Sequence, residues 1–204
     1  MATTPDYPPS NWAATDTTMI GQCPDISGTY VNKSEIAHYF SDFDCNSRKP
    51  SNSSGSWSCS EYITNNFGIP DEINDVIEIK QPNDKSIIVT TLSDKQPIKH
   101  FELTRGPIAG DFVCNNDGLV FSNSGSLLPN ALGVLGALTL QGGLISNTRS
   151  FRRTKDGALV MTVRENVHLW YVFFGGDSNV IAHIRWNAQD ASSALDEKKQ
   201  DSPR

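Results

Sequence analysis

The residues of this 204-residue chain best suited to covalent chemistry are four cysteines, Cys23, Cys45, Cys59 and Cys114. No two of them stand in a Cys-x-x-Cys spacing, so the signatures of a tetrahedral zinc site and of a thioredoxin-type redox centre are absent. Cys45 and Cys59 bracket a Ser-rich segment, and closing a loop of about 15 residues stabilises a fold by roughly 3 kcal/mol in the chain-entropy model. By elimination Cys23 pairs with Cys114. The even count favours disulfides, with free thiols as the alternative.

The four histidines do not form a metal-binding pattern. His38, His100, His168 and His183 include no His-x-x-x-His or Glu-x-x-His arrangement. His168 and His183 fall on neighbouring predicted strands and could face each other, but zinc requires three or four ligands. The sequence also lacks a Gly-x-Ser-x-Gly elbow, a phosphate loop and a dinucleotide fingerprint. We therefore assign no catalytic, cofactor-binding or metal-binding residue, and expect a protein that is not an enzyme and has no cofactor.

The charge of the chain argues against one class of partner. It has 17 basic and 23 acidic residues, a formal net charge of −6. Proteins bind phosphate backbones through clustered Lys and Arg, so we expect no nucleic-acid partner. The densest basic patch, Arg149, Arg152, Arg153 and Lys155, is typical of a solvated strand end.

The elements that must position these residues are mostly strands. Three pairs of segments flank short turn sequences, a pattern typical of hairpins: 75–80 with 86–92, 110–114 with 118–122, and 148–154 with 158–165. Further strands are expected at 26–32, 98–104, 167–174 and 180–186. The helix candidates are residues 33–41 and a Gly-rich run, residues 127–145.

Sequential hairpins of this kind favour an all-β fold. We expect an antiparallel meander that forms a lipocalin-like barrel or a sandwich, with an irregular N-terminal arm and one or two short helices. At the C-terminal end of the meander, the strand order should be 158–165, then 167–174, then 180–186, each paired with the next. Trp170 and Trp186 should be at least half buried.

The chain divides into three parts by composition. Residues 1–22 are predicted to form an irregular arm, which the side chains of Tyr7 and Trp12 could hold against another surface. The arm contains acidic residues and prolines but no apolar stretch of the kind found in signal peptides. Residues 23–188 read as a single β-rich domain, and residues 189–204 as a polar tail.

Residues 127–145 form the longest apolar run. No charged residue occurs from Gly118 to Thr148, but the glycines in the run disfavour a transmembrane helix. One interpretation is a loop or short helix that covers one end of the β core. The other is an exposed patch for a protein partner, for self-assembly or for a membrane surface. The candidate partner contacts are Leu132, Leu135, Leu138, Leu140 and Trp12.

The sequence "CPDISGTYVN" at 23–32 resembles the start of the mature chain in a group of small, uncharacterised bacterial lipoproteins. The segments "GDFVCNNDGLVF" at 110–121, "FRRTKDGALVM" at 151–161 and "HIRWN" at 183–187 are similar to later features of that group. The resemblance implies an all-β protein of the cell envelope, periplasmic, outer-membrane associated or secreted. Gln22 stands where lipoproteins carry a small residue, which disfavours lipid attachment to Cys23 and leaves a structural thiol as the better interpretation.

Two functions fit these features. The first is a non-enzymatic envelope or secreted protein that acts by binding, as a component of a protein assembly. The alternative is a carrier of a small apolar ligand in a lipocalin-like cavity, lined by Trp170, Phe174 and Trp186.

We expect Cys45 and Cys59 to form a disulfide in the exported protein, because the Ser-rich segment between them has few apolar residues to stabilise it. Peptide mapping without reduction should recover the two cysteines in one linked peptide. Alkylation of both cysteines in the native protein would contradict the pairing.

Overall fold

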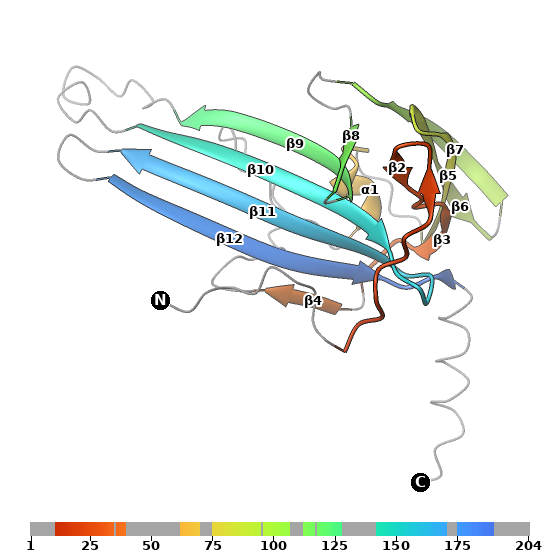
Figure 1. The fold of residues 1–204 in the computed structure, drawn as a ribbon. Helices are drawn as coiled ribbons and strands as arrows, with labels where there is room; N and C mark the ends of the chain where they lie inside the picture. Colours follow the sequence, from red (N-terminus) through yellow and green to blue (C-terminus); the bar gives the residue numbers. More distant parts are fainter. Residues whose placement is uncertain are drawn as a thin grey trace, which may run out of the picture.

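The computed structural model describes residues 11–34, 36–39, 62–69, 75–94, 96–106, 112–116, 118–127, 142–170 and 175–189. In this part of the chain nearly all regular structure is antiparallel strand (Figure 1). The elements are β1 (Met19–Ile20), β2 (Cys23–Pro24), β3 (Gly28–Val31), β4 (Ile36–Tyr39), α1 (Ile63–Asn66), β5 (Val76–Asn83), β6 (Ser86–Ser93), β7 (Gln96–Thr104), β8 (Phe112–Asn115), β9 (Gly118–Leu127), β10 (Gly142–Arg153), β11 (Leu159–Trp170) and β12 (Gly175–Trp186).

The larger sheet, called here the long sheet, has the strand order β4-β12-β11-β10-β9-β8. Apart from β4, neighbouring strands follow one another along the chain, so the predicted antiparallel meander is confirmed. Strands β10, β11 and β12 have 12 residues each. The turn between β10 and β11 depends on Gly157, whose φ of +83° is strained for any residue with a side chain.

The smaller sheet, called here the small sheet, has the order β3-β5-β6-β7. Its β5–β6 hairpin confirms the turn predicted from the residues between 80 and 86. The alternation of these strands buries Ile77 and Ile79 of β5, and Ile87 and Val89 of β6, on one face. A third, two-stranded ribbon joins β1 to β2.

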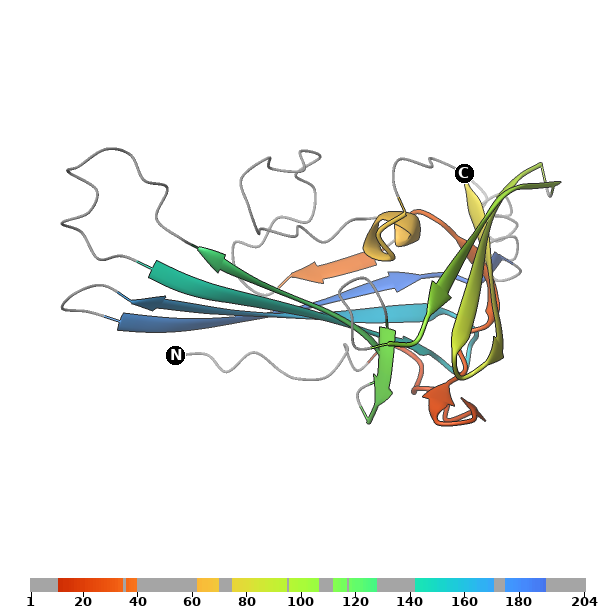
Figure 2. The same cartoon turned by 90° about the horizontal axis from the view of Figure 1, so that it is seen from above.

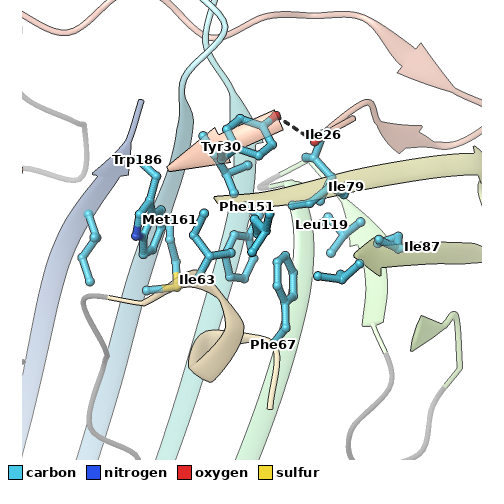
Figure 3. Packing of buried hydrophobic residues seen from close by; sticks show 14 of the residues in the cluster. Ile26, Tyr30, Ile63, Phe67, Ile79, Ile87, Leu119, Phe151, Met161 and Trp186 are labelled. Atoms are coloured by element: carbon cyan, nitrogen blue, oxygen red, sulfur yellow. Dashed lines mark hydrogen bonds between the residues drawn. The ribbon is translucent and has the colours of Figure 1, made fainter. Parts of the chain in front are cut away.

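The two larger sheets share one apolar core. Figure 2 shows the small sheet crossing one end of the long sheet, with α1 close to the junction. Phe67, directly after α1, stacks on Phe151 of β10 with 4.7 Å between ring centroids and meets Phe121 of β9 edge-on at 5.4 Å. Figure 3 shows Ile79 and Ile87 of the small sheet in the same cluster as Phe151 and Met161 of the long sheet.

The strands that the structure describes do not close into a barrel. The strand orders of the long and small sheets begin and end with different strands, and no pairing joins the two ends of either sheet. The fold class of the described residues is therefore mostly β, with antiparallel sheets. Cys23, in β2, is fully buried.

Two predictions about individual elements are wrong. Residues 33–41 were expected to be helical, but Ile36–Tyr39 form β4 and pair with β12. A short isolated helix is marginal, whereas the edge of β12 supplies backbone partners. The pairing expected between 158–165 and 167–174 is wrong for the residues that the structure describes, because Leu159–Trp170 run as one continuous strand, β11. This strand pairs with β10 and β12.

α1 is anchored from a distant part of the chain. Tyr62, the residue before its first turn, makes no side-chain capping bond. Instead the backbone N–H of Thr64 donates to the Asn32 side-chain oxygen at 3.3 Å, and the N–H of Ile63 donates to the Asn32 carbonyl at 3.0 Å. Asn32 is fully buried. Its amide thus does for α1 what an N-cap residue normally does.

The burial predicted for Trp186 is confirmed, since its ring is 0% exposed beside Met161 (Figure 3). We expect Trp186→Ala to lower the free energy of unfolding by about 3–5 kcal/mol, because truncation leaves a large cavity. Urea unfolding followed by circular dichroism measures the change. Ile98→Ala, at a residue 49% exposed, is the control and should change little. A loss below about 1 kcal/mol for Trp186→Ala would contradict the packing described.

Candidate interaction surface

The outer edge of β7 presents backbone groups that no described strand uses. β7 ends the strand order of the small sheet. The N–H of Arg105 donates to the carbonyl of Lys85 at 2.8 Å, toward β6. Backbone groups alternate in direction along an antiparallel strand, so those of His100 and Glu102 point away from β6. An edge of this kind is where extended segments of other chains add to a sheet.

The open part of this edge has defined limits. Lys99 pairs with Thr91, but the next pair is Pro97 with Leu92, so Ile98 is an extra residue that forms a β-bulge. At the other end, Gly106 donates its N–H to the carbonyl of Phe112 at 3.1 Å. Bulges, prolines and lysines protect edges from indiscriminate pairing. The part of the edge between the bulge and Gly106 is therefore short.

The side chains of β7 divide between the core and the surface. Phe101 and Leu103 are partly buried against the core. Ile98, His100 and Glu102 are exposed, and Ile98 is among the most exposed large apolar residues of the described chain. His100 Nδ1 lies 2.9 Å from the hydroxyl of the buried Thr90 on β6. This bond orients the imidazole while the rest of the ring faces outward.

A second polar cluster holds the N-terminal segment to β10. Arg153 donates from Nη2 to Asp16 Oδ2 at 2.7 Å and from Nη1 to the Ser27 carbonyl at 2.8 Å, and Asp25 lies 3.6 Å from Nη1. These bonds to Arg153 hold the pKa of Asp16 far below its ordinary value of 3.8. Next to them, burial raises the pKa of Tyr30, whose hydroxyl donates to the Ile26 carbonyl at 2.8 Å. This cluster, called here the clamp, ties the N-terminal segment to β10, and the charges of Arg153 and Asp16 are paired with each other.

Arg149 has a different environment from that expected for a solvated basic patch. It is 6% exposed on β10 and donates from Nη1 to the carbonyl of Asn66, the last residue of α1, at 3.0 Å. Desolvation lowers the pKa of Arg149 to about 10, so the guanidinium stays charged at neutral pH. The prediction of a solvated cluster is therefore wrong for this residue, because α1 packs over the face of the sheet on which it lies.

The histidine arrangement considered from sequence does not form. His183 pairs in register with Thr162, and its Nδ1 lies 3.0 Å from the Thr162 hydroxyl. His168 pairs with Asp177, six positions further along β11. His183 is fully buried. Among the described residues no group of three or more His, Cys, Asp and Glu side chains is placed to hold a metal ion.

Cys23 and Cys114 form the disulfide that elimination predicted, with Cα atoms 5.1 Å apart. It joins β2 to β8 and closes a loop of 91 residues, which stabilises the fold by about 4–5 kcal/mol in the chain-entropy model. Disulfides of this kind are typical of oxidising, extracytoplasmic compartments. In the described part of the chain no helix has the length and apolar character of a membrane span.

The structure places only some of the predicted site residues. Leu132, Leu135, Leu138, Leu140, Phe174, Cys45 and Cys59 lie outside the described residues, as does the side chain of Trp170. Trp12, expected as a partner contact, is only 8% exposed. Its segment is bound to the β10–β11 turn, where Lys155 donates its N–H to the Ala14 carbonyl. Trp186, expected in a ligand pocket, packs in the core instead.

Lowering the pH should weaken the clamp at Asp16. A carboxyl whose pKa is depressed in the folded state stabilises the fold above its unfolded pKa, and this contribution is lost as the pH falls below it. We expect the unfolding temperature of the wild type to fall from about pH 5 to pH 2 more steeply than that of Asp16→Asn. Calorimetry at a series of pH values measures both slopes. Equal slopes would show that Asp16 contributes no pH dependence.

Comparison of the chain with models of protein families, with curated protein sequences and with solved structures found no match. The fold and the surfaces described above are therefore the basis for inferring a function.

Proposed function

We propose that this protein is a non-enzymatic, extracytoplasmic binding protein that acts as a component of a protein assembly. The observation that carries the proposal is the outer edge of β7, where the backbone groups of His100 and Glu102 face away from the sheet. A partner strand added there would gain main-chain hydrogen bonds along the edge, and the exposed side chains of β7 would select its sequence.

The remaining polar clusters support this proposal because they have roles within the fold. Arg153 binds the N-terminal segment, Arg149 binds the end of α1, and His183 is buried against Thr162. These groups are engaged within the chain, whereas His100 and Glu102 of β7 are exposed.

The location and the finer architecture belong to the same proposal. The Cys23–Cys114 disulfide and the resemblance of residues 23–32 to envelope lipoproteins support an envelope or secreted location. Of the two architectures expected, two sheets over one core support a sandwich rather than a lipocalin-like barrel. The burial of Trp186 in that core also removes one of three aromatic residues that supported the carrier alternative.

Glu102→Pro tests the proposal at the β7 edge. Proline removes an outward N–H that β6 does not use, so the sheet should remain intact. Native mass spectrometry of the protein isolated from its natural source should show an assembly with the wild type and a free chain with Glu102→Pro. The unfolding temperature should change by only a few degrees, about what an edge substitution costs.

Glu102→Gln is the matched control, because it removes the same charge and keeps the N–H. It should retain the assembly. A wild-type chain that is always monomeric with a small molecule bound would favour the carrier alternative. A wild-type chain that is always monomeric and empty would contradict both functions.

A further inference from the structure

The outer edge of β7 has a sequence that is complementary to itself when two copies run antiparallel. Its central residues read His100-Phe101-Glu102, with a histidine and a carboxylate on either side of a phenylalanine. His100 and Glu102 are both exposed, and their backbone groups point away from β6. Two copies related by a two-fold axis present the same residues to each other in reverse order. The residue at which the axis passes therefore fixes which side chains face each other.

Three positions of the axis use this stretch, and they place different groups opposite one another. An axis at Glu102 puts two Glu102 carboxylates opposite each other, and like charges in that position are destabilising. An axis at His100 puts His100 opposite its copy and Glu102 opposite Ile98, the residue of the β-bulge. An axis at Phe101 puts each His100 opposite Glu102 of the other copy. Of the three registers, the one centred on Phe101 is favoured because it joins groups that attract.

The directions of the backbone groups fit the same register. The N–H of Arg105 donates toward β6, so alternation along the strand directs the backbone groups of Phe101 toward β6 and those of His100 and Glu102 outward. His100 and Glu102 of the other copy then form a hydrogen-bonded pair, which exchanges both N–H···O bonds. The two-fold axis generates a second such pair, giving about four main-chain hydrogen bonds in all. The two small sheets become one continuous sheet, with four strands from each copy.

The bond between His100 and Thr90 orients the imidazole for this contact. Nδ1 of His100 lies 2.9 Å from the Thr90 hydroxyl, so Nε2 is the ring nitrogen that can reach a partner. When the hydroxyl donates to Nδ1, the neutral ring carries its hydrogen on Nε2. Nε2–H then donates to the Glu102 carboxylate of the other copy, which is a charge-assisted hydrogen bond.

Phe101 lies on the opposite face of the strand and adds an apolar contact at the axis. Its ring is only partly buried against the core. In the register centred on Phe101, the two copies of this residue form a pair with no main-chain bonds between them, and side chains come closest in pairs of that kind. Each ring then covers the exposed part of the other, and aromatic pairs across strands are stabilising.

We propose that the partner at the β7 edge is a second copy of this chain, paired antiparallel about a two-fold axis at Phe101. This inference rests on the function proposed above and names the partner of the same edge. The bulge at Ile98 and the bond from Gly106 to Phe112 keep the open stretch short. The interface is therefore small, and we expect a weak dimer whose population rises with the concentration of the protein.

Sedimentation velocity of the full chain, with its disulfide intact, tests the proposal. The wild type should shift from monomer to dimer between about 1 μM and about 1 mM, the range of weak complexes. His100→Glu places two carboxylates opposite each other, and Glu102→Lys leaves His100 facing a second donor. Each variant should weaken the dimer by about tenfold or more, because the axis repeats the change in both pairs.

An equimolar mixture of His100→Glu and Glu102→Lys is the matched control. In a mixed dimer every carboxylate faces a histidine or a lysine, so the mixture should dimerise about as well as the wild type. A variant that had lost its fold would not be rescued by mixing, so recovery separates pairing at the edge from damage to the sheet.

The remaining outcomes distinguish this proposal from the function on which it rests. A wild type that stays monomeric over the whole range overturns the second copy as partner, as does a mixture that stays monomeric while the wild type dimerises. Glu102→Pro should be monomeric, and a dimer of that variant would place the contact on another surface and overturn the proposal. If the purified wild type is monomeric but joins a different protein in its natural source, and Glu102→Pro releases that protein, the binding function is supported and the partner proposed here is wrong.

Discussion

The structure depends on one constraint, the burial of a single apolar core between two sheets that cross. Neither sheet is covered without the other, because a half-buried sheet must place its apolar face against another element. Phe67 completes the contact by stacking on Phe151, at the point where α1 approaches the junction. The side chains of Ile79, Ile87 and Met161 then fill the space between the sheets (Figure 3).

Polar groups within the fold connect segments that are far apart in sequence. Arg153 binds residues more than a hundred positions earlier, and Arg149 reaches the end of α1. A charged donor in a partly or fully desolvated setting makes stronger hydrogen bonds than one in water, but it must be fully satisfied. These arginines therefore specify where the N-terminal segment and the short helix lie. The hydrogen bonds of both arginines therefore hold parts of the same chain together.

The parts of the fold that sequence predicted are those with local causes. Hairpins β5–β6, β8–β9 and β10–β11 follow from turn residues and alternation within about 20 residues. The strand β4 could not be found in this way, since its partner β12 lies over 130 residues further on. Likewise, burial of Arg149 depends on a distant helix, and the exposure of the β7 edge depends on strand order, which no periodicity encodes. Residues 158–165 and 167–174 were expected as two strands, but β11 runs through Glu165 and Asn166 without interruption.

The hydrogen bonds between Asn32 and Thr64 also bear on whether Asn32 can carry a glycan. Asn32-Lys33-Ser34 has the spacing of an acceptor for an N-linked glycan, as does Asn52-Ser53-Ser54. The Asn32 amide is fully buried and is bonded through both its oxygen and its nitrogen to Thr64. A sugar chain on this nitrogen would have to displace α1 from the core. A glycan on Asn32 is therefore incompatible with the folded arrangement, and one added to the nascent chain would prevent the helix from docking.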